Sequence, residues 1–423
     1  MYIEDAIKEK KEVTLRGWVS ELRDLKKVKF IILRDKSGVL QITIKDKPEL
    51  EKRFEELTKE SYIEVKGKIE ESKIAKLGAE MFPSEIKIIS KSEQPVPIDI
   101  SGKIETSLDK RLDWRFLDLR KKEVSAIFSI QSEITHLFRE FFRSKGFIEV
   151  WPPSIISEAT EGGTELFKVD YFGKKAFLAQ SPQLYKQLLV LSNLDKVFSI
   201  TPVWRAELHD TSKHLNEIRQ MDIEMANAND ETVMKFLEDF IKYLFRELKT
   251  KCSKELETLG RDLENPKVVY LTYNEVIKVL NENGLKINYG EDISSDAEKK
   301  LSEIYGKNTM IFIKKWPTEL KPFYIIPDEN NPKLSRGFDM DMGGIEISSG
   351  GQRVHKPEIL IERIKKSDLN PKDFEFYINS FKYGAPPHAG WSIGLERLTM
   401  VVCGLKNIRE ACLFPRDRNR LTP

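Results

Sequence analysis

Polar side chains recur with strand spacing on both sides of a loop within residues 201–226, and their types suit a charged ligand. Residues two apart on a strand point to the same face of a sheet, so each group is predicted to form one polar face. Arginine binds phosphate or carboxylate through paired hydrogen bonds, whereas carboxylates accept from ammonium groups. A plain solvent-facing hairpin is the alternative interpretation. The two groups are Arg205 with Glu207, and Gln220 with Asp222 and Glu224.

Two glycine-containing segments near the C-terminus each lead into an arginine. Glycine lets a ligand approach the backbone closely. The second segment is predicted to pass from a strand into a helix, and a helix N-terminus attracts phosphate. A single glycine-rich turn is weak evidence by itself. The segments are residues 344–355 (GIEISSGGQRVH), with Glu346, Ser349 and Arg353, and residues 386–398 (PPHAGWSIGLERL), with Gly394 and Arg397.

Three further segments could contribute to the same site. Residues 146–153 (GFIEVWPP) predict a strand that ends in a proline pair, and residues 161–167 (EGGTELF) predict a loop able to move over a ligand. Residues 180–186 (QSPQLYK) follow an apolar run and would place Gln183 and Lys186 at the start of a helix. Each pattern alone is also typical of an ordinary turn or a solvated lysine.

These segments lie in a chain of 423 residues that is 40% hydrophobic, 33% charged and has a formal net charge of +2. This composition predicts a globular protein of two or three domains and excludes a disordered chain, a collagen-like fibre and a disulfide scaffold. No run approaches the roughly 18 apolar residues of a membrane helix. No membrane association is therefore expected. The three cysteines form no CxxC pair, which argues against a zinc ribbon or a disulfide framework, and a reducing, cytoplasmic location is expected.

The first 98 residues predict a small β-domain. Five β-rich runs with a helical segment between the third and fourth follow the order of an OB-fold barrel. The runs are residues 13–20, 28–35, 39–44, 61–70 and 81–90, and the helical segment is residues 48–59.

The remaining chain predicts a hinge and a larger α+β domain. Residues 99–120 follow a proline-rich stop and form the expected hinge. Residues 121–423 alternate helical and strand-like segments, beginning with an amphipathic helix over residues 122–145. Within this domain, residues 227–310 are helix-rich and highly charged and carry no recognisable chemistry.

Taken in order, the five segments resemble a class II aminoacyl-tRNA synthetase. Arg205-x-Glu207 resembles its motif 2, residues 394–397 (GLER) its motif 3, and the stretch ending at Pro153 its motif 1, which contacts the partner in family dimers. The resemblance implies a catalytic domain built on an antiparallel β-sheet flanked by helices. With the OB domain in front, the chain is similar to aspartyl-tRNA synthetases of the archaeal type, and the likeness extends to its final residues 414–423 (FPRDRNRLTP).

The resemblance implies that L-aspartate is activated by ATP to aspartyl-adenylate and passed to the 3′ end of tRNA(Asp). The attacking α-carboxylate is already ionised at pH 7, so the site needs positioning and charge neutralisation rather than a general base. Arg205 would contact the α-phosphate and this carboxylate, and Arg397 the outer phosphate, as the two catalytic residues. Mg²⁺, which prefers oxygen ligands, would be held by Glu346 and Ser349. The other expected ATP-binding residues are Glu207, Lys213, His214, Leu215, Gly394, Leu395 and Glu396.

Selection of aspartate depends on its side-chain carboxylate. Arg353 offers a planar pair of donors and Lys186 a second positive charge, which asparagine would leave unsatisfied. Gln183 and Asp222 are expected to hold the ammonium group, with Glu161 in a loop that closes over it and Arg205 and Ser349 nearby. One departure from the family is Ile218, which stands where many relatives have an aromatic residue that stacks on adenine.

The OB domain is expected to bind the tRNA anticodon. Phe30 would stack on a base and Gln41 would hydrogen-bond to a base edge. Six basic side chains around them would attract the phosphate backbone. In an arbitrary barrel, Phe30 would more often be core. The basic residues are Arg23, Lys26, Lys27, Lys29, Arg34 and Lys36.

Several alternatives share these features. An asparaginyl-tRNA synthetase has the same fold and motifs, although Lys186 and Arg353 together favour aspartate. The enzyme could also charge tRNA(Asn), a choice made in the OB domain near Ser20 and residues 83–85. A non-catalytic RNA-binding paralogue should have lost Arg205, Glu346 or Arg397, and all three are present. An amide-forming synthetase of this fold should lack the OB domain. A homodimer is expected.

Overall fold

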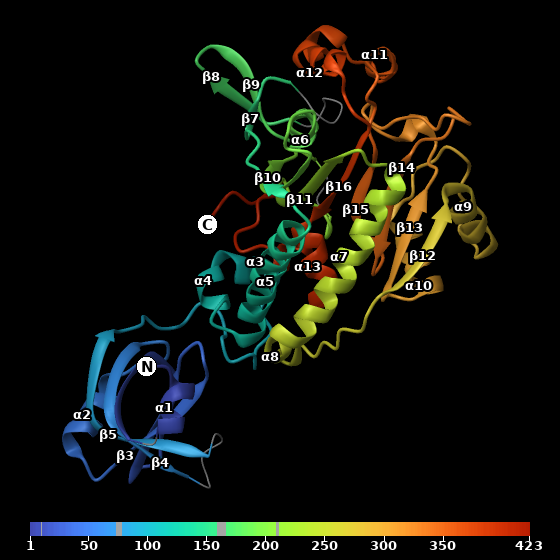
Figure 1. The fold of residues 1–423 in the computed structure, drawn as a ribbon. Helices are drawn as coiled ribbons and strands as arrows, with labels where there is room; N and C mark the ends of the chain where they lie inside the picture. Colours follow the sequence, from blue (N-terminus) through green and yellow to red (C-terminus); the bar gives the residue numbers. More distant parts are fainter. Residues whose placement is uncertain (10, 73–77, 159–165, 209–210) are drawn as a thin grey trace. The chain divides into compact units, whose positions relative to one another are not determined.

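The computed structural model describes residues 1–9, 11–72, 78–158, 166–208 and 211–423 (Figure 1). Internal contacts divide the chain into two compact units, Met1–Ser125 and Ala126–Pro423. Among the described residues, no helix is long and apolar enough to cross a membrane.

The N-terminal unit contains a closed five-stranded barrel with strand order β1-β2-β3-β5-β4. Helix α2 (Pro48–Glu56) connects the third and fourth strands, so the predicted OB-fold order is confirmed. Alternate residues point inward, and Ile31 and Leu33 of β2 are completely buried. The strands are β1 (Glu12–Asp24), β2 (Val28–Arg34), β3 (Val39–Lys45), β4 (Tyr62–Glu71) and β5 (Ala79–Ser90), preceded by α1 (Ile3–Glu9).

The segment predicted as a hinge contains two short helices, α3 (Leu108–Asp113) and α4 (Arg115–Asp118). The carboxylate of Asp118 is fully buried and accepts hydrogen bonds from Arg111 Nε at 2.9 Å and Arg115 Nη1 at 2.8 Å. These charged groups order the segment, which belongs by its contacts to the N-terminal unit.

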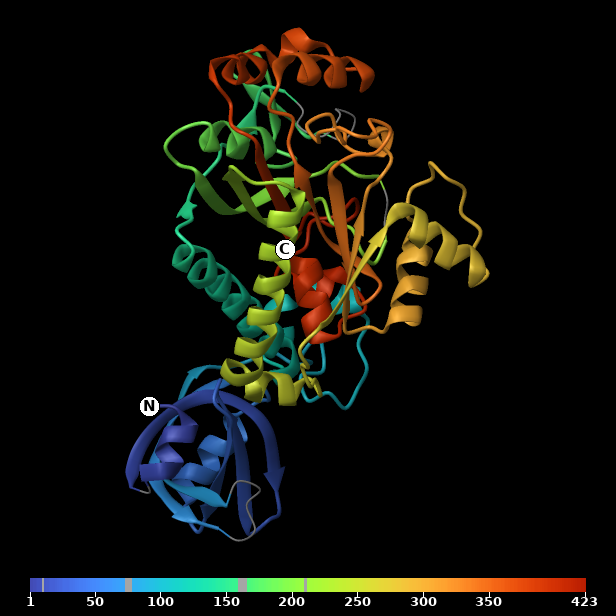
Figure 2. The same ribbon diagram turned by 45° about the vertical axis from the view of Figure 1, so that its right-hand side comes forward.

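The C-terminal unit is built on an eight-stranded sheet with order β12-β13-β14-β15-β16-β11-β10-β6 (Figures 1 and 2). Its six central strands pair antiparallel, and the two outer pairs, β12 with β13 and β10 with β6, are parallel. The predicted antiparallel catalytic sheet is therefore confirmed, with parallel strands added at its edges. The strands are β6 (Ile148–Glu149), β10 (Lys196–Trp204), β11 (Glu217–Ala226), β12 (Lys267–Thr272), β13 (Thr309–Lys314), β14 (Gly337–Met342), β15 (Ile345–Gln352) and β16 (His388–Gly394).

Three helices cover one face of this sheet: α5 (Lys122–Ser144), α7 (Asp230–Lys251) and α13 (Leu395–Cys403) (Figures 1 and 2). Their apolar stripes and the sheet form the largest core. At its centre Trp391 of β16 packs against Phe142 and Phe240, with ring centroids 5.5 and 6.5 Å apart. This packed face leaves the opposite face of the central strands for a ligand.

The remaining elements surround the sheet. Residues 227–310 contain the predicted helices, but they also supply β12, which the sequence pattern did not reveal. A separate three-stranded sheet has the order β7-β9-β8. These elements are α8 (Ser253–Thr258), α9 (Tyr273–Glu282), α10 (Ser295–Tyr305), β7 (Ile155–Ile156), β8 (Lys168–Tyr171), β9 (Lys174–Leu178), α6 (Gln183–Val190), α11 (Pro357–Lys366) and α12 (Glu375–Ser380).

Candidate active site

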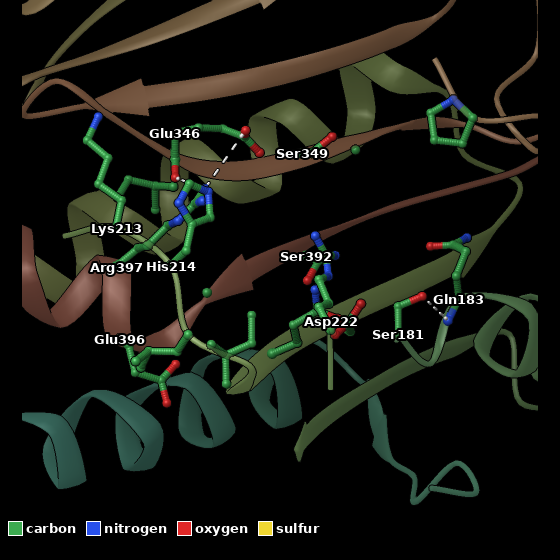
Figure 3. Close-up of a pocket in the computed structure, with 18 of the residues that line it drawn as sticks. Ser181, Gln183, Lys213, His214, Asp222, Glu346, Ser349, Ser392, Glu396 and Arg397 are labelled. Atoms are coloured by element: carbon green, nitrogen blue, oxygen red, sulfur yellow. Dashed lines mark hydrogen bonds and ion pairs between the residues drawn. The ribbon is translucent and has the colours of Figure 1, made fainter. Parts of the chain in front are cut away.

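A cavity of about 260 Å³ lies on the face of the sheet opposite α5 and α7, and the first turn of α13 forms part of its lining (Figure 3). Strands β11, β15 and β16 supply its floor, and in their register Ser392 pairs with both Asp222 and Ser349. Most of its lining side chains are polar. They are Ser181, Gln183, Arg205, Glu207, Lys213, His214, Leu215, Ile218, Gln220, Asp222, Lys321, Pro322, Tyr324, Ile325, Glu346, Ile347, Ser349, Gly350, Arg353, Ser392, Gly394, Glu396, Arg397 and Ile408.

Arg205 is fixed by its backbone while its side chain remains available. It directly follows β10, and Asn216 closes the hairpin: Arg205 N donates to Asn216 O at 3.0 Å, and Asn216 Nδ2 donates to Arg205 O at 2.7 Å. Asn216 Nδ2 also reaches Glu207 O at 3.2 Å. Within the described chain, the buried Nε of Arg205 has no hydrogen-bond partner. A buried, unpaired guanidinium donor suits an anionic ligand.

The floor also presents buried oxygen atoms that lack partners. Asp222 Oδ2, Gln220 Oε1 and Ser392 Oγ accept or donate no hydrogen bond within the described residues. Burial raises the pKa of the Asp222 carboxyl, although the adjacent Lys186 opposes this effect. A cationic ligand group beside Asp222 would satisfy its free oxygen.

Four charged side chains form a buried network at the floor of the cavity, of which Asp222 and Arg353 line it and Lys186 and Glu224 lie beneath. Arg353 donates to Glu224 through Nε at 2.9 Å and Nη2 at 3.1 Å. Lys186 Nζ lies 2.8 Å from Asp222 Oδ1 and 3.5 Å from Glu224 Oε2. Burial alone would raise the pKa of the Glu224 carboxyl, but the charges of Arg353 and Lys186 lower it overall. The network holds two positive and two negative charges, so it is neutral as a unit.

Arg353 retains a guanidinium nitrogen, Nη1, whose N–H groups can donate to a ligand. Its Nη1 makes no hydrogen bond to any residue in the described ranges, and the side chain lines the cavity. Gly390 permits this arrangement, because a Cβ at that position would collide with the Glu224 carboxylate. The local sequence therefore makes room for the buried ion pair.

A β-bulge brings Glu346 and Ser349 to the same cavity. Residues three apart on a regular strand point to opposite faces. The pairing of β14 with β15 shifts between Met340 and Asp341, which reverses the alternation. Both side chains consequently line the cavity.

Glu346 and Ser349 fit a hard cation such as Mg²⁺, because both offer oxygen ligands beside a site for phosphate. Asp339, paired with Ser349 in the sheet, adds a buried carboxylate. Burial raises the pKa of Asp339, while Lys321, which bonds to it, opposes the shift. No described cluster of three or more His, Cys, Asp or Glu side chains forms a metal site by itself. Phosphate oxygens would have to complete the coordination.

The other end of the cavity is rich in positive charge. Arg397 Nη1 donates to Glu346 O at 3.0 Å and lies 3.9 Å from its carboxylate (Figure 3). Lys213 Nζ is held by Glu298 Oε2 at 2.7 Å and Gly344 O at 2.9 Å. Glu396 instead accepts the backbone N–H of Arg219 at 3.0 and 3.2 Å, and burial raises its pKa to about 7.

The structure brings most of the predicted site residues together. Lys186 and Leu395 do not line the cavity: Lys186 is 1% exposed beneath the floor, and Leu395 packs in the core. Glu161 lies outside the described residues. The predicted residues that line the cavity are Gln183, Arg205, Glu207, Lys213, His214, Leu215, Asp222, Glu346, Ser349, Arg353, Gly394, Glu396 and Arg397.

Sequence reasoning did not select several lining residues. Ser392 lies inside residues 386–398, the segment selected for Gly394 and Arg397, and strand alternation from Gly390 and Gly394 would have placed it on their face. Lys321 and Tyr324 come from a loop without regular pattern and give no such signal. The position noted for its missing aromatic residue, Ile218, does line the cavity.

In the barrel, Phe30 and Gln41 both lie on the outer face. Phe30 is half-buried between the inward-pointing neighbours Lys29 and Ile31, and it pairs with Arg23 and Thr43 on adjacent strands. It is therefore not a core residue of the barrel. Gln41 Nε2 lies 3.3 Å from Glu80 Oε2.

The predicted basic patch near Phe30 is weaker than six charges. Arg34 is buried and bonds to Glu60 at 2.7 Å, which removes it from the surface. Arg23 pairs with Glu21 at 2.8 Å and Lys29 with Asp24 at 2.6 Å. The sequence identifies the basic residues but does not show which carboxylates form ion pairs with them. Lys26, Lys27 and Lys36 complete the set.

Family comparisons agree with both units. The model of class II tRNA synthetases (D, K and N) matches residues 107–418, and the model of the OB-fold nucleic acid binding domain matches residues 13–89. The chain is 48% identical over 417 residues to the aspartate–tRNA(Asp/Asn) ligase of Methanothermobacter thermautotrophicus, covering 97% of this chain and 95% of that protein. It is 46% identical to the aspartate–tRNA(Asp) ligase of Pyrococcus horikoshii, covering 98% and 96%.

Solved structures show the same architecture over the whole chain. The asparaginyl-tRNA synthetase from Pyrococcus horikoshii, complexed with asparaginyl-adenylate, has a TM-score of 0.94 at 31% identity and covers 100% of this chain and 99% of its own. The aspartyl-tRNA synthetase from Entamoeba histolytica has a TM-score of 0.89 at 32% identity and covers 100% and 92%.

Proposed function

The chain belongs to the class II tRNA synthetases of the D, K and N group, and we propose that it is an aspartate–tRNA ligase. It activates L-aspartate with ATP and transfers the aspartyl group to the 3′ end of tRNA(Asp). It is 46% identical to the aspartate–tRNA(Asp) ligase of Pyrococcus horikoshii but 31% identical to the asparaginyl-tRNA synthetase of the same organism. This difference favours aspartate over asparagine.

The observation that carries the proposal is the charge pattern at the closed end of the cavity. Among the described residues, Asp222 Oδ2 is buried without a partner, which suits the α-ammonium group of an amino acid. Arg353 Nη1 likewise has no partner among them and suits the side-chain carboxylate, and Lys186 adds positive potential from beneath the floor. The ammonium group and the side-chain carboxylate of aspartate add one positive and one negative charge, so the neutral network stays neutral when aspartate binds. Asparagine would give Arg353 a weaker, uncharged acceptor.

In the first step the α-carboxylate attacks the α-phosphate of ATP and pyrophosphate leaves. Arg205 holds the attacking carboxylate and the α-phosphate together, and Arg397 binds the outer phosphate. Glu207, Lys213, His214 and Leu215 hold adenine and phosphates, and Ile218 replaces an aromatic platform with an apolar contact. Glu346 and Ser349, with Asp339 behind them, would hold Mg²⁺, which neutralises phosphate charge when bound.

In the second step a hydroxyl of the terminal tRNA ribose attacks the aspartyl carbonyl, and AMP leaves. The barrel contributes by binding the anticodon through the face that holds Phe30 and Gln41. The reaction takes place in the cytoplasm, where tRNA is used. The three cysteines all lie in the described chain, are buried and form no disulfide, as suits that location.

We further propose a homodimer formed through the β6 edge of the large sheet. Strand β6 has only two residues, and its surroundings expose large apolar side chains: Ile148 at 46%, Trp151 at 79% and Ile155 at 45%. Such a patch at a sheet edge is typical of a protein interface.

The decisive experiment is aminoacylation of tRNA(Asp) and tRNA(Asn) transcripts with labelled aspartate and, separately, labelled asparagine. We expect aspartate on tRNA(Asp). Aspartate on both transcripts would define an enzyme that also supplies tRNA(Asn), as the names of some relatives state for those proteins. Charging with asparagine alone would overturn the proposal and the assignment of Arg353.

A further inference from the structure

Two glutamine side chains on α6 are joined at the closed end of the cavity. Gln183 begins the helix and Gln187 follows one turn later, so their side chains are neighbours. Gln183 Nε2 donates to Gln187 Oε1 at 2.8 Å, and both residues are buried. Only Gln183 lines the cavity.

Gln187 connects Gln183 to a buried histidine. Gln187 Nε2 lies 2.9 Å from His388 Nε2, and His388 Nδ1 lies 2.9 Å from Pro386 O. Tyr377 OH donates to Gln187 Oε1 at 2.9 Å. The side chains of Gln183, Gln187, Tyr377 and His388 are all buried, so their polar atoms must find partners within the protein.

The direction of every hydrogen bond follows from the Pro386 carbonyl. A carbonyl can only accept, so His388 must carry its proton on Nδ1. Burial lowers the pKa of His388 to about 4, which leaves its Nε2 as an acceptor near neutral pH. Gln187 must then donate through Nε2 and turn Oε1 toward Gln183. Gln183 in turn must use its amide nitrogen as the donor.

The last amide in this series therefore presents its oxygen to the ligand. In Figure 3 the amide oxygen of Gln183 lies on the side of Asp222 and Ser392, and the nitrogen lies away from them. A flipped Gln187 would place its oxygen against the acceptor nitrogen of His388. It would also require Gln183 to direct an N–H at the ligand, which would repel an ammonium group.

We propose that Gln187 and His388 are positioning residues that hold the Gln183 amide oxygen toward the α-ammonium group of the substrate. We call the hydrogen-bonded series Pro386 O, His388, Gln187 and Gln183 the relay. Because the Pro386 carbonyl can only accept, it sets the direction of each following hydrogen bond, and His388 and Gln187 act without touching the substrate. It complements Asp222, whose free oxygen faces the same group. The inference rests on the proposed function only in assuming that the cavity binds an amino acid.

The test is a double-mutant cycle in aspartate-dependent ATP–pyrophosphate exchange. Methionine resembles glutamine in length but cannot donate to His388 and offers no amide oxygen to Gln183. Gln187→Met should raise the KM for aspartate about tenfold or more, while the KM for ATP changes less than twofold. Gln183→Met should raise the aspartate KM at least as much. The double variant should match Gln183→Met within about twofold, because the relay acts only through Gln183.

Gln131→Met is the matched control, since this partly buried amide bonds to Thr399 and Ala411 at a distance from the cavity lining. It should leave both KM values within twofold. Multiplicative effects in the double variant, or an equal rise in the KM for ATP, would overturn the relay. If circular dichroism shows that Gln187→Met does not fold, His388→Phe replaces it, because a phenyl ring can still stack on Phe381. This variant must then raise the KM for aspartate without a comparable rise in the KM for ATP.

The wild-type protein separates this inference from the proposed function. If it activates asparagine instead of aspartate, the proposed substrate is wrong, but the cycle can be run with asparagine because the α-ammonium group is the same. A rise in the KM for the amino acid without a comparable rise in the KM for ATP would still support the relay. Its absence would reject the relay even in a proven aspartate enzyme.

Discussion

At the scale of single residues, the charges at the floor of the cavity hold one another in one arrangement. Lys186, Asp222, Glu224 and Arg353 are each 2% exposed or less. Removing one member of such a buried set leaves another charge uncompensated, which is strongly unfavourable. The network therefore fixes the direction in which the Nη1 group of Arg353 points.

Arg353→Lys should impair aspartate binding selectively. Lysine keeps the positive charge but cannot bond to Glu224 at two points and also present a donor to the ligand. We expect the KM for aspartate in pyrophosphate exchange to rise about ten- to a hundredfold with little change for ATP. Arg261→Lys, which alters an arginine bonded to the carbonyls of Val401 and Val402, is the control. An unchanged aspartate KM would remove Arg353 from substrate recognition.

His388 should make the folded protein less stable in mild acid. Its pKa is lowered from 6.5 to about 4, so the folded protein keeps it neutral while the unfolded chain protonates it. Stability is therefore lost as pH falls from about 6.5 toward 4, by about 3 kcal/mol for this group. Three nearby charged or titratable side chains also act on the His388 pKa. Glu224 raises it, and Arg353 and His355 lower it.

The measurement is the free energy of unfolding against pH for wild type and His388→Asn. The wild type should lose more stability between pH 6.5 and 4 than the variant, because only the wild type has this imidazole to protonate. His136→Asn, at a side chain that is 62% exposed, should follow the wild-type curve. Parallel curves for His388→Asn and wild type would contradict the burial argument.

Strand spacing and glycine patterns predicted part of the cavity lining, and the family resemblance added Lys213, His214, Leu215 and Glu396. Arg205, Asp222 and Arg397 were found because their spacing or their place at a strand-to-helix turn carries a local signal. Lys321 has no such signal, because its position depends on a loop that folds back over the sheet. The burial of Lys186 on helix α6 was equally unpredictable, since its charge is compensated by two carboxylates on strand β11, Asp222 and Glu224.

At the scale of elements, the C-terminal segment holds the β10–β11 hairpin. Asn216 N donates to Arg416 O at 2.7 Å, and Ile408 N donates to Ser212 O at 2.8 Å. Arg409 links Thr211 O at 3.1 Å to Asp417 at 2.6 Å. Residues nearly two hundred positions apart are thus tied together beside Lys213 and His214, which line the cavity.

Asp417→Asn should loosen this connection and affect ATP more than aspartate. Loss of the charged partner frees Arg409 to move away from the hairpin. We expect the KM for ATP to rise about three- to tenfold, with a smaller change for aspartate, because small displacements of binding groups weaken positioning. Asp262→Asn, at an exposed aspartate that pairs with Lys249, is the control. An equal change in both KM values would indicate general destabilisation instead.

Alternation and turn residues predicted the barrel strands and the polar hairpin, but not every element. The bulge in β15 has no local signature, yet it alone explains why Glu346 and Ser349 share a face. The bulge depends on how β15 pairs with β14, which no short segment encodes. Strand β12 was missed for another reason: its run KVVYLT has β-branched and aromatic residues typical of a strand, but it lies within a charged, helix-rich region.

At the scale of the whole molecule, the exposed apolar residues near β6 predict an assembly. Trp151→Glu should shift the protein from dimer to monomer, because a charge would be buried in the interface. Sedimentation equilibrium measures the change directly. Phe172→Glu, which charges a side chain that is 91% exposed on the β8–β9 turn, is the control. A monomeric wild-type protein would reject the proposed dimer.

The two units also predict that tRNA recognition and amino-acid activation can be separated by mutation. Each unit has its own core, and the aspartate and ATP groups of the cavity all come from the C-terminal unit. Phe30 lies on the outer face of the barrel, where removal of an aromatic ring should leave the core intact.

Phe30→Ala should therefore lower kcat/KM for tRNA charging about five- to a hundredfold, as expected for loss of one stacked base. Pyrophosphate exchange, which needs no tRNA, should stay within twofold of wild type. Ile89→Ala, at a barrel side chain that is 47% exposed, should change neither assay. If Phe30→Ala reduced both activities equally, its ring would stabilise the fold rather than bind the anticodon. If it reduced neither, anticodon binding would have to be assigned to another face of the barrel.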